Sequence, residues 1–200
     1  MELDILKSIH YNMHGSNFIN HLMKWISIIS DDGLIWLGLA IIFLCFKKTR
    51  KAGILTIICV GATFILNSLL LKNIIARPRP FTESAELATF IESLGMELPD
   101  SYSFPSGHTF SSFACATVIS LQLKKKWPFV YIFSTLVAFS RVFLCCHYIT
   151  DVIVGAIIGT LVAFAIYYAM KYIFKKLDEF VIKHRQNKLN KAQEEQTPQK

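Results

Sequence analysis

The sequence predicts an all-α protein whose helices cross a lipid bilayer several times. Three observations carry this prediction: 53% of the 200 residues are hydrophobic, only 18% are charged, and long uncharged runs recur along the chain. Charged residues normally make up about a quarter of a soluble domain. The net charge of +7 leaves nucleic-acid binding as the competing hypothesis until the positions of the charges are considered.

Five apolar stretches are predicted to span the membrane, because about 20 apolar residues cross a hydrocarbon core of about 30 Å. They are residues 25–46, 52–71, 104–123, 127–146 and 152–170. The first contains Asp31 and Asp32, and the apolar part after Gly33 is too short to span alone at about 1.5 Å per residue. We therefore expect this helix to break or bend near these residues.

The two ends of the chain differ from this transmembrane core, which we place at residues 31–174. In residues 1–30, apolar side chains such as Ile5, Ile9, Phe18 and Leu22 recur at roughly helical spacing among polar ones. This predicts one or two short amphipathic helices at the membrane interface, and a sixth crossing is the alternative. Residues 175–200 are predicted to be a basic, partly disordered cytoplasmic tail.

The positions of the lysines and arginines predict the orientation in the membrane. Three basic clusters flank the predicted spans: Lys47, Lys48, Arg50 and Lys51; Lys124, Lys125 and Lys126; and Lys171, Lys175 and Lys176. If the five spans alternate, all three lie on one side, which the positive-inside rule assigns to the cytoplasm. Because the basic residues flank spans and form no folded basic module, nucleic-acid binding is disfavoured. We expect a multi-pass protein of the cell membrane.

The few cations on the predicted outer side belong to three motifs at the ends of spans. The motifs are Lys72 with Arg79 and Pro80, then Pro105-Ser106-Gly107-His108, and finally Ser140-Arg141 with His147 and Asp151. Prolines stop the helix after the first motif, and the second motif starts a helix whose free N–H groups form an anion site. On a helix His147 and Asp151 lie one turn apart, so the carboxylate is expected to fix the imidazole tautomer.

These motifs predict phosphate chemistry when they are taken together. Three cations repel one another unless an anion joins them, and a tetrahedral phosphate suits guanidinium groups and helix N–H donors. An arginine inside a predicted span, such as Arg141, is energetically costly and therefore also indicates a functional role. No second carboxylate or set of His and Cys residues is placed in the sequence to hold a metal. We therefore expect metal-independent phosphoryl transfer through a histidine.

The three motifs resemble those of the type 2 phosphatidic acid phosphatase (PAP2) family, which is related to the vanadium haloperoxidases. Eleven motif positions match in family order and spacing, and the resemblance covers residues from about 52 to 170. It implies a small bacterial integral-membrane lipid phosphatase without a cofactor. His147 is then the nucleophile, Asp151 its partner and His108 the acid and base. The implied phosphate ligands are Lys72, Arg79, Ser106, Gly107 and Arg141, with Arg77 as an additional candidate.

The resemblance implies a membrane lipid phosphate or diphosphate as substrate, with the active site on the extracytoplasmic face. Undecaprenyl diphosphate is the lead candidate, and phosphatidylglycerophosphate and phosphatidic acid are the alternatives. Two hypotheses from other classes remain. A small transporter is expected to carry its polar residues at mid-depth, whereas these lie at span ends. A lipid-binding member without activity is expected to lack one of the two histidines, and this sequence has both.

Overall fold

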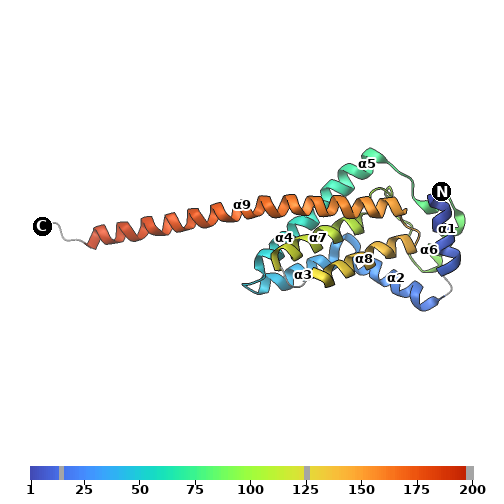
Figure 1. Cartoon of the computed structure of the whole chain (residues 1–200), viewed down its shortest axis with the longest axis horizontal. Helices are drawn as coiled ribbons and strands as arrows, with labels where there is room; N and C mark the ends of the chain where they lie inside the picture. The colour runs from blue at the N-terminus through green and yellow to red at the C-terminus, as the bar shows by residue number, and fades with distance from the viewer. Residues whose placement is uncertain (14–15, 124–126, 197–200) are drawn as a thin grey trace.

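The computed structural model describes residues 1–13, 16–123 and 127–196, and the regular structure in these ranges is helical. The elements are α1 (Glu2–Met13), α2 (Asn17–Ile29), η1 (Asp31–Gly33), α3 (Leu34–Cys45), α4 (Arg50–Phe64), the π-helical η2 (Ile65–Leu71), α5 (Lys72–Ile75), η3 (Pro80–Thr82), α6 (Ala85–Ser93), α7 (Gly107–Leu123), α8 (Trp127–Phe143) and α9 (Ile149–Gln196). Figure 1 shows α3, α4, α7 and α8 bundled along the first part of α9, with α1 and α6 at one end.

Two helical segments are long and apolar enough to cross a membrane by length and composition, Arg50–Thr82 and Ile149–Lys188. The pair α2 and α3 passes the same test together and bends by 47° between its two parts, so it forms a third candidate if it is one span. Helices α7 and α8 have 17 residues each. The described residues therefore contain two or three candidate spans, and the count of five stays a prediction.

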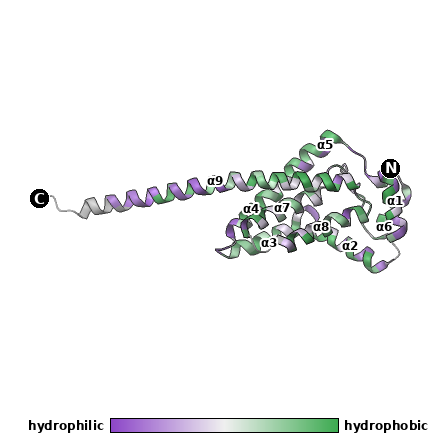
Figure 2. Ribbon diagram, viewed as in Figure 1, coloured by the Kyte–Doolittle hydropathy of each residue, from purple (hydrophilic) through white to green (hydrophobic). Residues whose placement is uncertain are grey.

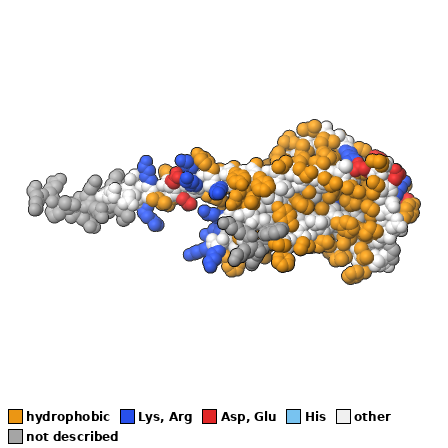
Figure 3. Space-filling view, in the orientation of Figure 1, with side chains coloured by type: hydrophobic (Ala, Val, Ile, Leu, Met, Phe, Trp, Pro, Cys, Tyr) orange, Lys and Arg blue, Asp and Glu red, His pale blue; other side chains and the backbone are white. Residues whose placement is uncertain are grey.

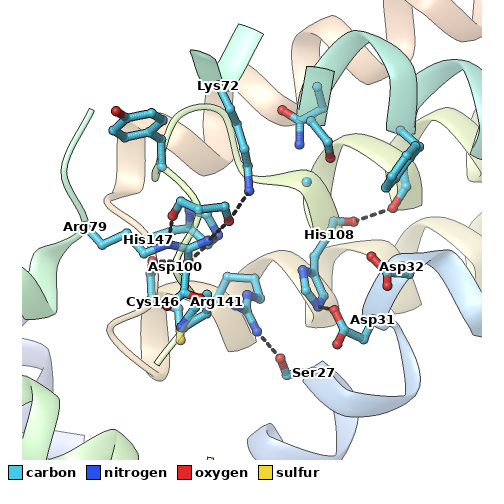
Figure 4. Close-up of a pocket in the computed structure, with 18 of the residues that line it drawn as sticks. Ser27, Asp31, Asp32, Lys72, Arg79, Asp100, His108, Arg141, Cys146 and His147 are labelled. Carbon is cyan, nitrogen blue, oxygen red and sulfur yellow. Dashed lines mark hydrogen bonds and ion pairs between the residues drawn. The ribbon is translucent and has the colours of Figure 1, made fainter. Parts of the chain in front are cut away.

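The break expected near Asp31 is confirmed. Between α2 and α3 the chain forms one 3₁₀ turn, in which Asp32 has φ 46° and Gly33 has φ 75°. Glycine adopts this left-handed backbone without steric cost, which explains why the helix can turn here. The turn points both aspartates into the end of the bundle that also receives the N-terminus of α7 (Figure 4).

Helix α7 is the centre of the bundle and packs closely on α9. A Cβ atom on Gly159 would lie 2.4 Å from the carbonyl oxygen of Phe110, and one on Gly155 would lie 3.0 Å from that of Ser106. These glycines let the first turn of α7 approach α9 closely, and the Ser106 N–H donates to the carbonyl oxygen of Asp151 at 3.1 Å. The second and third sequence motifs are thereby joined through the backbone.

The opposite end of the bundle carries the basic residues. Lys51 follows the turn between α3 and α4. Its Nζ lies 3.8 Å from Oδ2 of Asp178 on α9 and 5.2 Å from the ring centroid of Phe174. Figure 3 shows these lysines and arginines gathered away from the end that holds α1. The predicted cluster of Lys124 to Lys126 lies outside the described residues. Figure 2 shows α9 becoming hydrophilic beyond the bundle, and the predicted tail is helical as far as Gln196.

Candidate active site

A cavity of about 970 Å³ opens at the end of the bundle where the three motifs meet. Six of the residues expected to form the site line it: Lys72, Arg79, Gly107, His108, Arg141 and His147 (Figure 4). Ser106, Asp151 and Arg77 are not part of the lining. Ser106 is fully buried, and its hydroxyl accepts a hydrogen bond from the Thr109 hydroxyl at 3.1 Å. The structure thus brings the predicted cations and both histidines together and places these three residues around them.

Arg79 is 4% exposed and is held on several sides. Its Nε donates to the carbonyl oxygen of Ser101 at 2.6 Å, and its Nη1 donates to that of Cys146 at 3.1 Å. The Ser101 hydroxyl lies 3.0 Å from Nη2 of Arg79 and 2.9 Å from Nζ of Lys72. One hydroxyl group therefore accepts hydrogen bonds from two cations, in a position that a phosphate oxygen suits equally well.

The end of α8 places Arg141 beside His147. The N–H groups of Cys146 and His147 donate to the carbonyl oxygen of Arg141 at 3.1 and 3.3 Å, and Cys145 adopts a left-handed conformation with φ 54°. The Arg141 side chain is 4% exposed and bonds to the hydroxyl of Ser27, while its Nε is buried and has no hydrogen-bond partner among the described residues. Arg141 lines the cavity, and a buried guanidinium with an unpaired donor is suited to bind an anion.

His147 is 1% exposed and presents its two ring nitrogens to different partners. Its Nε2 lies 3.4 Å from Nη1 of Arg79, on the cavity side. Its Nδ1 lies 3.6 Å from Oδ2 of Asp151, which is longer than a hydrogen bond. Burial, and then the charges of Arg79, Arg141 and Lys72, hold the pKa of His147 well below its ordinary value. The imidazole is therefore neutral at neutral pH, with a lone pair available.

The structure differs from the expectation that His147 and Asp151 share a helix and bond directly. His147 precedes α9, whereas Asp151 lies in its first turn and accepts a hydrogen bond from the Tyr148 N–H at 2.9 Å, like the carboxylate of a capping box. The fully buried hydroxyl of Ser103 lies 2.5 Å from Oδ2 of Asp151 and 3.4 Å from Nδ1 of His147. Because the α9 cap occupies the carboxylate, a serine hydroxyl stands between the two groups.

His108 faces the same cavity from the first turn of α7. Its Nε2 lies 3.2 Å from Oδ1 of Asp31, so the break in the N-terminal helix pair supplies a carboxylate to the site. Gly107 precedes it, and a Cβ atom there would lie 2.7 Å from Nδ2 of Asn67. A side chain at position 107 would displace the Asn67 amide, so glycine lets Asn67 approach the turn that carries His108.

Sequence reasoning missed three residues of this site, Asp31, Ser101 and Ser103. Asp31 was interpreted only as a helix break, although a carboxylate within a predicted span is itself a signal of function. Ser103 is two residues before Pro105, within reach of the second motif. For Ser101, which lies in a loop, no sequence signal stands out.

Residues 51–175, more than half of the chain, match the PAP2 superfamily. The chain belongs to the PAP2 superfamily. Among PAP2 relatives, it is 30% identical over 156 residues to an undecaprenyl-diphosphatase of Sulfolobus acidocaldarius, with 76% of this chain and 70% of the relative covered. It is 34% identical over 121 residues to phosphatidylglycerophosphatase B of Bacillus subtilis, which covers 55% of this chain and 53% of the relative.

The PAP2 fold is also found in solved structures. The crystal structure of Aquifex aeolicus LpxE superposes with a TM-score of 0.64 at 22% identity, over 82% of this chain and 93% of LpxE. At this identity the likeness concerns the fold. The curated relatives are phosphatases by name, so the chain belongs to a family of phosphatases, and its apolar helices agree with a membrane location.

Proposed function

We propose that this protein is a multi-pass membrane enzyme that hydrolyses a phosphate or diphosphate group of a membrane lipid through a phosphohistidine. One observation carries the proposal: two histidines and three cations line a single cavity of about 970 Å³. The three cations supply the positive charge that a phosphoryl transition state needs, so the reaction is proposed to proceed without a metal ion.

In the first step, Nε2 of His147 attacks phosphorus as the bond from phosphorus to the leaving oxygen breaks. His108 donates a proton to that oxygen, and the phosphate group is left on His147. Arg79, Arg141 and Lys72 hold the nonbridging oxygens together with the N–H of Gly107, while Ser106 supports the turn behind it. Asp151 and the Ser103 hydroxyl face the opposite ring nitrogen.

In the second step, a water molecule attacks the phosphorus atom and the bond from nitrogen to phosphorus breaks. His108, which has lost its proton, accepts one from this water, and inorganic phosphate leaves. The same residue thus serves as acid and then as base. The carboxylate of Asp31 lies 3.2 Å from Nε2 of His108 and is placed to orient this ring.

Undecaprenyl diphosphate is the proposed substrate, because the similarity to an undecaprenyl-diphosphatase extends over three quarters of this chain. The leaving group is then undecaprenyl phosphate. Phosphatidylglycerophosphate is the second candidate, favoured by the 34% identity to phosphatidylglycerophosphatase B. Phosphatidic acid is the third member of the test set, on the resemblance of the motifs alone.

The proposed topology has five crossings, with the cavity at the outer face and the tail in the cytoplasm. The support is the separation of charges along the bundle: the exposed lysines near Lys51 and Lys175 lie at one end and the cavity at the other. Helices α7 and α8, at about 25 Å each, would cross as short spans. Residues 1–30 are proposed to lie at the outer interface.

The test is phosphate release by the purified, detergent-solubilised protein from these three lipids, with and without EDTA. We expect release from undecaprenyl diphosphate above the other two, no effect of EDTA, and inhibition by vanadate as a phosphate mimic. His147→Ala should reduce release to background while the protein still inserts and elutes as the wild type does. Activity of that variant near the wild-type level would contradict the mechanism, and loss of activity with EDTA would contradict metal independence.

A further inference from the structure

Arg77 lies on the far side of Asp151 from the cavity and connects this carboxylate to the N-terminal helix. Its Nη1 donates to Oδ1 of Asp151 at 2.6 Å and to the hydroxyl of Thr150 at 2.7 Å. Its Nη2 donates to Oε2 of Glu2 at 2.5 Å. The guanidinium carbon also lies 3.9 Å from the ring centroid of Tyr148. Arg77 therefore bridges two carboxylates, and it is not one of the cations around the cavity.

Helix α1 is packed against the turn that carries His147. Leu6 is fully buried in a small cluster with Val142 and Tyr148, the residues on either side of that turn. The second carboxylate oxygen of Glu2 accepts a hydrogen bond from the Thr150 N–H at 3.2 Å, in the first turn of α9. Glu2 thus contacts both Arg77 and the helix that holds Asp151.

The charges of these groups alternate along a line that ends at His147. A guanidinium at 2.6 Å offsets the negative charge that Asp151 presents to the imidazole, and Glu2 offsets the charge of that guanidinium. This matters because the groups that face His147 from the other elements are mostly cationic. They are Lys72 from α5, Arg79 from the loop before η3, Arg141 from α8 and His108 from α7, against Asp151 from α9.

We propose that Glu2 and Arg77 are positioning residues for the reaction: the pair holds the Asp151 carboxylate toward His147, and Glu2 keeps the group of three net negative. Helix α1 is then a part of the active site that touches no substrate. The inference rests on the proposed function, because it assigns these residues to the histidine that carries the phosphate. Nothing in the three motifs requires Glu2, so this is a feature of the fold of this chain.

The two charges act in opposite directions on the imidazole. Without Glu2, Arg77 is uncompensated and protonated His147 becomes less favourable. Without Arg77, Glu2 and Asp151 are left together and protonated His147 becomes more favourable, although the carboxylate loses its fixed position. A contact that only stabilised the fold would move both variants in the same direction or neither.

The experiment compares Glu2→Gln, Arg77→Gln and the double variant in the full chain, with any tag at the C-terminus. We expect kcat to fall about fivefold in Glu2→Gln and about tenfold in Arg77→Gln, with KM little changed. The acidic limb of the kcat/KM profile should move to lower pH in the first and to higher pH in the second. In the Arg77→Gln background, Glu2→Gln should lower kcat no further, because Glu2 acts through Arg77.

Asp4→Asn is the matched control, since Asp4 lies on the same helix, is 80% exposed and pairs only with the N-terminal amine in the described structure. It should behave as the wild type. The inference is overturned if Glu2→Gln has the same kcat and pH profile as this control. It is also overturned if the acidic limbs of Glu2→Gln and Arg77→Gln move in the same direction, or if the effects of the two substitutions on kcat are additive. A wild-type protein that releases no phosphate from any lipid would instead overturn the proposed function, so the two failures are distinguishable.

Discussion

The two ends of the helical bundle both gather positive charge, but they hold it differently. Arg79 and Arg141 at the cavity are 4% exposed, and Arg79 alone makes hydrogen bonds to the carbonyl oxygens of two residues and to one hydroxyl. Lys51 and Lys175 at the far end have side chains 54% and 75% exposed and lie 3.8 and 3.9 Å from single carboxylates. Burial therefore separates Arg79 and Arg141 at the cavity from Lys51 and Lys175 at the surface.

The physical reason for the difference is desolvation. An exposed ion pair contributes about 0–1 kcal/mol, so the lysines at the far end are free to serve topology. A buried charge that lacks a counter-ion costs several kcal/mol. Under the proposed function, a bound phosphate would supply negative charge to Arg79, Arg141 and Lys72 at the cavity, whereas the exposed lysines need no such partner.

The sharpest way to break this comparison is to remove one cation from each end. Arg79→Ala should lower kcat/KM about 10²-fold to 10³-fold, because in the proposed mechanism the guanidinium holds an oxygen that gains charge in the transition state. Lys175→Ala should change it by less than about twofold, since its charge is solvated. Phosphate release from the preferred lipid under subsaturating conditions measures both.

Arg79→Lys is the control for misfolding, because lysine keeps the positive charge at this position and removes only the planar guanidinium group. It should stay impaired while its thermal unfolding matches that of the wild type. Equal losses from Arg79→Ala and Lys175→Ala would show that net charge, and not the buried contacts, controls activity, and the contrast between the two ends would be lost.

A smaller effect should follow from changing a hydroxyl instead of a charge. Ser103→Ala removes the group between Nδ1 of His147 and Oδ2 of Asp151, which are too far apart to bond directly. We expect kcat to fall about tenfold with KM unchanged, as for other residues that orient a catalytic group. Single-turnover phosphate release separates this loss from a change in binding.

The matched control is Ser120→Ala on α7, whose hydroxyl bonds to the carbonyl oxygen of Ala116 at 2.6 Å within its own helix. It should keep wild-type kcat. If Ser103→Ala does the same, the serine only fills space, and the imidazole is oriented by other contacts.

How much of this was available from the sequence differs between the two ends as well. The basic end could be predicted, because an exposed cluster such as Lys47 to Lys51 acts through its number of charges and its place beside a span. The residues of the three motifs could be predicted because each motif places reactive or cationic side chains at a fixed spacing along the chain. The break at Asp31 followed from charge and glycine in an apolar run, and it was confirmed by the backbone angles.

The contacts between segments far apart in sequence could not be predicted. Ser103 reaches Asp151 across 48 positions and Glu2 reaches Arg77 across 75, and no local pattern specifies such partners. The direct hydrogen bond expected between His147 and Asp151 does not form for a local reason, because His147 precedes α9 and the Asp151 carboxylate caps the first turn of that helix. Asp31 was missed as a second carboxylate of the site for the same reason that Ser103 was missed. It lies beside His108 only because the tertiary fold brings the two segments together.

The smallest expected effect concerns the attachment of α1 as pH falls. Burial acts to raise the pKa of Glu2, but hydrogen bonds from Arg77 and Thr150 outweigh it and leave the pKa below its ordinary 4.5. A carboxylate with a lowered pKa stabilises the folded state above its ordinary pKa, and this contribution is lost as pH falls through the lowered value. Protection of α1 amides against hydrogen exchange, corrected for intrinsic rates, should therefore decline below about pH 4.5. In Glu2→Gln the protection should be lower at pH 7 and lack this decline. Parallel pH profiles in the two proteins would mean that the ion pair of Glu2 adds nothing measurable to the stability of α1, which its other contacts, such as those of Leu6, would then hold in place.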